Sequence, residues 1–201
     1  MGSEFDEFLL HASRIYRILI NVGRKGLTPE RTHQLRSWIS YYLSQPYADH
    51  GERFFSFPGK PPAAEVIEKK PFSDGIRRLY AFQSGYKVRN PDFQEYFERF
   101  EQNRTAYVYH WQHGDKERKT VLCCHGWSLG EPGRAARMFR IHKLYNLGLD
   151  VALFITPFHW KRASTRALRF SPPFPFQYPV LGLEGMGQAM YDLAATFLLL
   201  N

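Results

Sequence analysis

The N-terminal part of the chain carries apolar side chains at the spacing of amphipathic helices. Residues 5–22 place them three or four positions apart, with charged residues between, which predicts one helix. Gly23 and Gly26 end it, and Thr28 followed by Pro29 predicts the N-cap and first turn of a second helix. Helices of this kind most often pack their apolar side on a larger domain. The apolar positions are Phe5, Phe8, Leu9, Ala12, Ile15, Tyr16, Leu19 and Val22, then Leu35, Trp38, Ile39 and Leu43.

The pattern then changes from helical to strand-like. Residues 54–64 combine proline, glycine and aromatic residues, and we expect them to form a connector. Residues 75–88 and 105–114 are rich in aromatic and β-branched side chains, which predicts two strands. The segment between them, 91–103, predicts a helix.

Strands and helices alternate in the C-terminal part of the chain. Residues 119–126 form a short apolar run typical of a strand buried on both faces. A helix is expected over 134–146, with Gly148 as its left-handed C-cap. Residues 150–160 predict a second buried strand, and 184–200 a last helix. This alternation predicts an α/β fold, with a mostly parallel sheet flanked by helices.

The chain is basic, with a net charge of +8 from 27 Lys and Arg against 19 Asp and Glu. The charge is spread along the chain, so a solvated surface accounts for it, and it would also favour an anionic substrate. No basic block is interleaved with exposed aromatic residues, so nucleic-acid binding is not expected. The amphipathic pattern of 5–22 would serve equally well at a membrane surface, which leaves peripheral membrane contact open.

The chain has two adjacent cysteines, Cys123 and Cys124. Neighbours on a strand point to opposite faces, so no disulfide framework is expected, and a reducing, cytoplasmic location fits. His110, His113 and Asp115 do not all face one side of a strand, so we expect neither a metal nor another cofactor. Arginines interrupt the N-terminal apolar run, so no signal peptide or membrane span is predicted.

Residues 121–130, VLCCHGWSLG, allow two interpretations as part of an active site. The first is a nucleophile elbow, because the segment from Gly126 to Gly130 matches G-x-S-x-G around Ser128. The loop continues through Gly133 before a helix can begin, whereas an elbow serine opens its helix at once. The acids and histidines that follow are also poorly placed for a triad. Ser128 is therefore kept as the alternative nucleophile.

The second interpretation makes the same segment an oxyanion loop. His125, Gly126 and Trp127 follow a buried strand, where a backbone N–H can point at negative charge developing on a carbonyl oxygen. One such donor contributes about 3 kcal/mol to transition-state stabilisation. We expect the backbone N–H of Trp127 to be the donor, Gly126 to let the chain turn, and His125 to brace the loop.

The segments VLCCHGW and GLDVALFITPFHWKR, with a helix between them, resemble the N-terminal half of an α/β-hydrolase. They are most similar to bacterial esterase- or lipase-like members in which a strand ends in Pro-x-His and a basic residue. The resemblance implies strand 3 of that fold at 120–125 and strand 4 at 150–156. It also implies serine-type hydrolysis of a carboxylic ester or similar acyl bond, without a cofactor. We accordingly expect a helical extension and linker over 1–64 and half of a hydrolase core over 65–201.

The same resemblance implies a further half beyond Asn201. We expect this chain to lack the serine nucleophile and its base, and to be inactive by itself. In the hydrolase sheet strand 3 lies between strands 4 and 5. Without strand 5, residues 120–124 would form an open apolar edge, which invites pairing with another chain.

Three polar residues after the second buried strand are candidates for substrate binding: His159, Lys161 and Arg162. Arg162, with Lys161, is expected to bind an anionic group of a small, ester-like or lipid substrate. A polar loop behind Pro157 would explain the same residues without any function. The rival hypothesis for the whole chain is a non-catalytic binding or interaction module built on a hydrolase-like sheet.

Overall fold

The computed structural model describes residues 28–126, 131–163 and 179–201. The chain divides into two compact units, 1–40 and 41–201. Helix α2 (Pro29–Ser44) begins in the first unit and ends in the second, and it starts where Thr28 and Pro29 predict. The helix expected over 5–22 lies outside the described residues.

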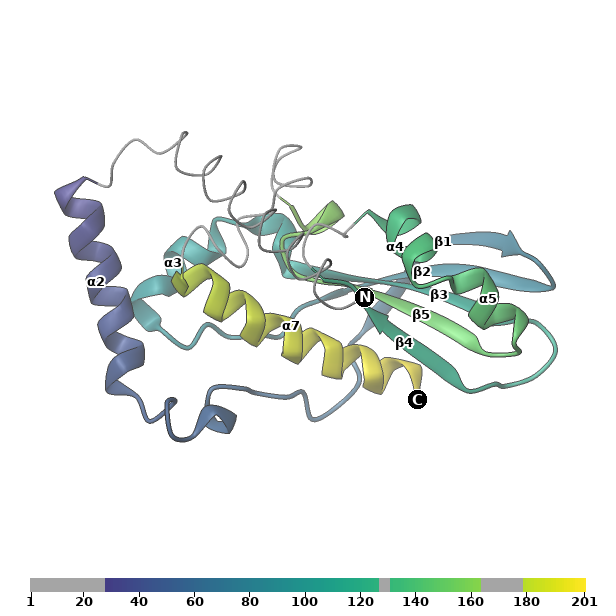
Figure 1. The fold of residues 1–201 in the computed structure, drawn as a ribbon, viewed down its shortest axis with the longest axis horizontal. Helices are drawn as coiled ribbons and strands as arrows, with labels where there is room; N and C mark the ends of the chain where they lie inside the picture. The colour runs from purple at the N-terminus through teal and green to yellow at the C-terminus, as the bar shows by residue number, and fades with distance from the viewer. Residues whose placement is uncertain (1–27, 127–130, 164–178) are drawn as a thin grey trace, which may run out of the picture. The chain divides into compact units, whose positions relative to one another are not determined.

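The second unit contains a five-stranded mixed sheet in the order β1-β2-β3-β5-β4 (Figure 1). Its pairs β1–β2, β2–β3 and β3–β5 are antiparallel, and only β4–β5 is parallel. The prediction of a mostly parallel sheet is therefore wrong, although the α/β class is confirmed. The strands are β1 (Ala64–Phe72), β2 (Gly75–Gln83), β3 (Thr105–His113), β4 (Thr120–Cys124) and β5 (Asp150–Ile155).

The antiparallel part of the sheet begins with a tight hairpin that the hydrophobic pattern did not reveal. Strand β1 joins β2 through Ser73 and Asp74, and Ser73 adopts the left-handed conformation, with φ of 49°. Tight hairpin turns require such angles. A Cβ on Gly75 would lie only 2.0 Å from the carbonyl oxygen of Gln112, so the close approach of β3 requires glycine there.

Helices cover both faces of the sheet (Figure 1). Helices α4 (Pro132–Met138) and α5 (Ile141–Asn146) pack on one face, and α7 (Pro179–Leu200) packs on the other. One helix was expected over 134–146, but Arg140, with φ of 52°, divides it in two. The other elements within the described residues are α3 (Pro91–Glu98) and the short 3₁₀ helices Gly51–Arg53, Glu101–Arg104 and Trp160–Arg162.

Strand β5 is the centre of the core, as its apolar sequence predicts. All six of its residues are buried between β3 and β4 in the sheet and between the two helical layers. Burying each large apolar side chain stabilises the fold by roughly 1.5–3 kcal/mol. Gly148, with φ of 86°, closes the preceding helix as predicted.

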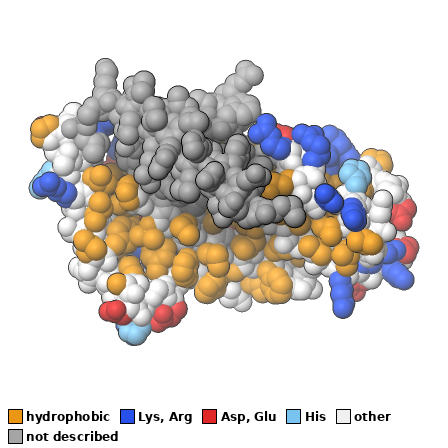
Figure 2. Space-filling model, in the orientation of Figure 1, with side chains coloured by type: hydrophobic (Ala, Val, Ile, Leu, Met, Phe, Trp, Pro, Cys, Tyr) orange, Lys and Arg blue, Asp and Glu red, His pale blue; other side chains and the backbone are white. Residues whose placement is uncertain are grey.

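Strand β4 lies at an edge of the sheet, as expected for residues 120–124. The prediction that it is buried on both faces is wrong, because only Cys123 is buried and Cys124 is exposed. Among the described strands it pairs only with β5, and its sequence, TVLCC, carries no charge. A groove of about 460 Å³ adjoins it, lined by Leu122 and by apolar residues of α7. Figure 2 shows hydrophobic side chains gathered along this helix, where Met186, Met190 and Phe197 are exposed. Even so, none of the helices within the described ranges has the length and hydrophobicity to cross a membrane.

Candidate functional site

The candidate site lies where the two parallel strands end. Strand β4 ends at Cys124 and is followed by His125 and Gly126, while β5 ends at Ile155 and is followed by Thr156. Because β4 and β5 are parallel neighbours, both turns emerge at the same edge of the sheet. The carboxyl ends of parallel strands are where α/β sheets place ligand sites.

His125 ties these two turns together. Its imidazole is 2% exposed, and Nε2 lies 3.2 Å from the backbone nitrogen of Thr156. A backbone N–H can only donate, so Nε2 accepts, and the ring proton belongs on Nδ1. That nitrogen lies 2.9 Å from the carbonyl oxygen of Gly126 and donates to it. Both ring nitrogens are thus occupied, and burial lowers the pKa of His125, so this arrangement makes it a neutral brace.

His159 stands beside this brace, with its ring centroid 5.0 Å from that of His125. Its Nδ1 lies 2.8 Å from the carbonyl oxygen of Pro157, to which it donates, and 3.0 Å from the hydroxyl of Thr156. Its Nε2 is buried and has no partner among the described residues. Burial lowers the pKa of His159 to about 4, so the ring is neutral near pH 7.

The turn that carries His159 has an unusual backbone. Phe158 and Trp160, on either side of it, have φ of 62° and 50°. The left-handed region costs a residue with a side chain roughly 1–2 kcal/mol. Tertiary contacts compensate, because the Phe158 N–H donates to Asn103 Oδ1 over 3.0 Å and its ring packs edge-on against Phe100. Such retained strain is common at functional sites.

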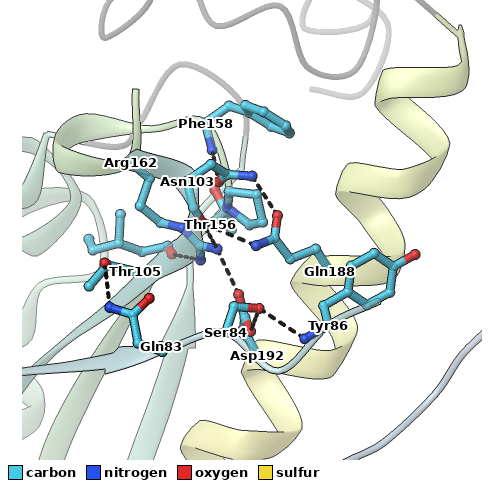
Figure 3. A network of polar contacts seen from close by, with 12 residues as sticks. Gln83, Ser84, Tyr86, Asn103, Thr105, Thr156, Phe158, Arg162, Gln188 and Asp192 are labelled. Atoms are coloured by element: carbon cyan, nitrogen blue, oxygen red, sulfur yellow. Dashed lines mark hydrogen bonds and ion pairs between the residues drawn. The ribbon is translucent and has the colours of Figure 1, made fainter. Parts of the chain in front are cut away.

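Arg162 is not available to bind a substrate anion. Its side chain is fully buried, and its Nη2 lies 2.7 Å from Asp192 Oδ2 on α7 (Figure 3). The guanidinium also donates to the carbonyl oxygens of Ile155 and Asn103. The expectation that Arg162 binds an anionic substrate group does not agree with this placement, because an internal carboxylate already compensates its charge.

Lys161 remains at the surface next to this buried pair. Its ammonium lies 5.0 Å from the ring centroid of Trp160 and 5.7 Å from that of Tyr107. These cation–π contacts hold the chain along the aromatic face while the charge stays hydrated. Of the three predicted substrate-binding residues, only Lys161 thus presents its charge to solvent.

The proposed donor and the alternative nucleophile, Trp127 and Ser128, lie outside the described residues. Gly126 is exposed, and a Cβ there would meet nothing within 4 Å. In the described parts of the chain no serine or cysteine hydrogen-bonds to a histidine, and no three His, Cys, Asp or Glu side chains gather where they could hold a metal. Burial raises the pKa of the Cys123 thiol, which disfavours its thiolate.

Sequence reasoning missed the polar network beneath the site (Figure 3). Asp192 accepts from Arg162 and also from the hydroxyl of Ser84, over 2.6 Å. Asn103 and Gln188 pair through their side-chain amides over 2.5 Å. Asp192 and Gln188 are polar residues in an apolar helix, and that signal could have marked them. Asn103 gave no comparable signal.

A second buried carboxylate, Glu184, anchors the start of α7. It is fully buried and accepts from the backbone N–H groups of Arg89 and Asn90, at 3.0 and 3.1 Å. The hydroxyl of Tyr86 donates to it over 2.6 Å, and that of Tyr42 also donates to it. Two backbone and two phenolic groups thus donate to this carboxylate, and no cation among the described residues forms an ion pair with it.

Replacing Tyr86 with phenylalanine is expected to lower the free energy of unfolding by about 2 kcal/mol, because it removes one hydrogen bond to a buried charge. Tyr80→Phe is the matched control, since the Tyr80 hydroxyl makes no hydrogen bond among the described residues. Urea denaturation of both variants measures the difference. Equal stability of the two would show that the Tyr86 bond contributes nothing.

No protein-family model, curated protein or solved structure matches this chain.

Proposed function

We propose that this chain carries the oxyanion loop of an α/β-hydrolase-like protein that hydrolyses a carboxylic ester or similar acyl bond. The strand arrangement supports the proposal. In the resemblance, strand 4 neighbours strand 3, and β5 and β4 are parallel neighbours in those positions. The antiparallel strands β2 and β3 on the other side of β5 are compatible with a mixed hydrolase sheet.

The observation that carries the proposal is the hydrogen bond from His125 Nδ1 to the Gly126 carbonyl. A trans peptide unit is planar, so its C=O and its N–H point in opposite directions. The N–H of this unit belongs to Trp127, and we propose that it is the donor, pointing away from the imidazole. A preorganised donor of this kind is what an oxyanion hole requires.

The nucleophile and base are a separate part of the proposal. Ser84, a member of the polar network, donates to Asp192 and makes no hydrogen bond to an imidazole among the described residues. We therefore assign both groups to residues outside the described ranges, with Ser128 as the alternative nucleophile. The substrate would be a small ester-like or lipid molecule.

Removing the proposed donor gives a direct test. In the intact gene product, Trp127→Pro deletes the backbone N–H and is expected to lower kcat/KM for p-nitrophenyl butyrate by roughly 10²–10³-fold. Trp127→Phe keeps the N–H and should stay within about threefold, since the donor belongs to the backbone. Circular dichroism confirms that each variant is folded.

Three outcomes would reject the proposal. Equal losses in Trp127→Pro and Trp127→Phe would assign the effect to the indole instead of the N–H. Complete loss of hydrolysis and of fluorophosphonate labelling in Ser128→Ala would make this segment the nucleophile elbow. Absence of hydrolysis in the intact gene product would favour the non-catalytic module.

A further inference from the structure

A separate cavity of about 540 Å³ opens between the end of β2, helix α3 and α7. Strand β2 is antiparallel to β3, which is antiparallel to β5, so β2 and β5 run in the same direction. Gln83, the last residue of β2, lines the cavity, which therefore lies at the carboxyl edge of these strands. Its volume is within the usual range of small-molecule sites.

Buried amides contribute to the cavity lining, and each of their side-chain oxygens already accepts a hydrogen bond. Asn103 and Gln188 are 1% and 2% exposed. Asn103 Oδ1 accepts from Phe158, the Asn103 carbonyl accepts from Arg162 and Gln188, and Gln188 Oε1 accepts from Asn103. Each amide nitrogen carries two hydrogens and donates one of them within this network. Within this network one hydrogen of each amide nitrogen remains available as a donor, and each side-chain oxygen already accepts one hydrogen bond.

The lining also contains aromatic, charged and neutral polar side chains. Phe97 and Phe100 contribute aromatic surface, and Lys87 and Arg104 contribute exposed cations. The one carboxylate in the lining, Glu98, accepts from Gln94 over 2.8 Å and lies 3.6 Å from Arg104. Lys87 makes no ion pair among the described residues. The charges that line the cavity thus sum to +1.

From these features we propose that the cavity binds a small amphiphilic monocarboxylate, with its carboxylate toward Lys87 and the amide donors and its hydrocarbon chain against the phenylalanines. The site matches both parts of such a ligand: amide N–H groups and an ammonium donate to the carboxylate, and aromatic faces receive the chain. The proposal does not depend on ester hydrolysis, because binding is measured directly.

Hexanoate is the probe, with hexanol and acetate as matched controls. Titration of the folded chain followed by ¹H–¹⁵N NMR should shift the side-chain amide signals of Asn103 and Gln188. Hexanol lacks the charge-assisted hydrogen bonds, and acetate lacks the chain, so each should bind at least roughly tenfold more weakly. Equal affinity for hexanol, or shifts confined to the groove beside Phe197, would overturn the proposal.

Charge variants provide the second arm. Lys87→Gln should weaken hexanoate binding by roughly two- to fivefold, as expected for a solvent-exposed ion pair. Lys116→Gln makes the same charge change in the exposed turn between β3 and β4 and should leave the affinity unchanged. If Lys87→Gln and Lys116→Gln weakened hexanoate binding equally, the effect would come from the net charge of the protein and not from Lys87 at the cavity, which would contradict the proposal. Gln188→Leu removes an amide donor to a charged group, so the folded variant should bind hexanoate roughly tenfold more weakly.

Discussion

Replacing Asp192 with alanine is expected to lower the free energy of unfolding by about 3–5 kcal/mol, the usual effect of breaking a buried ion pair. Both partners are fully buried, and the carboxylate lies 2.7 Å from the Arg162 guanidinium. Burial opposes both charges, raising the pKa of Asp192 and lowering that of Arg162. The loss arises because the substitution leaves an uncompensated cation in the core.

Two further variants distinguish this mechanism from simple loss of packing. Arg162→Met combined with Asp192→Leu removes both charges at similar volume and should restore most of the lost stability, since such replacements are often neutral or favourable. Asp115→Ala removes the exposed partner of Arg118 and should change stability far less, because solvent screens that pair. Urea or thermal unfolding of the single and double variants measures these differences. A double variant no more stable than Asp192→Ala alone would contradict the argument.

The same ion pair shows which property of the site could not be predicted from the sequence, namely the direction in which the Arg162 side chain points. The residues after β5 could be expected near a carboxyl edge, because a buried apolar strand precedes them. Whether a side chain there points outward or inward depends on what lies beneath it. Arg162 turns inward because α7 supplies Asp192, which follows it by thirty positions in the sequence, and no local pattern encodes that meeting.

The sequence predicted the buried strands of the fold better than the exposed ones. Strand β5 is buried on both faces and is visible as an apolar run. Strand β1 has mostly exposed residues and a charged sequence, so no periodic pattern marks it. Strands β2 and β3 were predicted, but their antiparallel direction was not, because strand direction is set by long-range pairing.

The turn that carries His125 and Gly126 is intermediate between these cases. The position of His125 and Gly126 at the end of a strand followed from the sequence, and a bracing role for the imidazole was expected there. Its partner Thr156 was not expected, because the hydrogen bond joins the turns after two different strands. The pairing of parallel strands brings these turns together, so their contact depends on sheet topology instead of on any motif.

Acid is expected to destabilise this fold through histidines buried without charge compensation. The ring of His110, on β3, is 4% exposed, and neither of its nitrogens has a partner among the described residues. Burial lowers its pKa to about 4; Asp150 opposes this shift and Arg78 adds to it. Between that value and the ordinary 6.5 the unfolded chain binds more protons than the folded one, so stability falls as pH falls through this window.

The expected loss is about 3 kcal/mol for each such imidazole between pH 6.5 and 4, and His159, whose pKa is also lowered to about 4, contributes similarly. His110→Phe should remove one of these contributions without loss of stability at pH 7, because it replaces two unsatisfied polar atoms with a ring of similar shape. His142→Phe is the control, since that imidazole is exposed. Urea unfolding at intervals from pH 7 to 4 measures the slope. A slope in His110→Phe as steep as in the parent chain would show that the proton uptake occurs elsewhere.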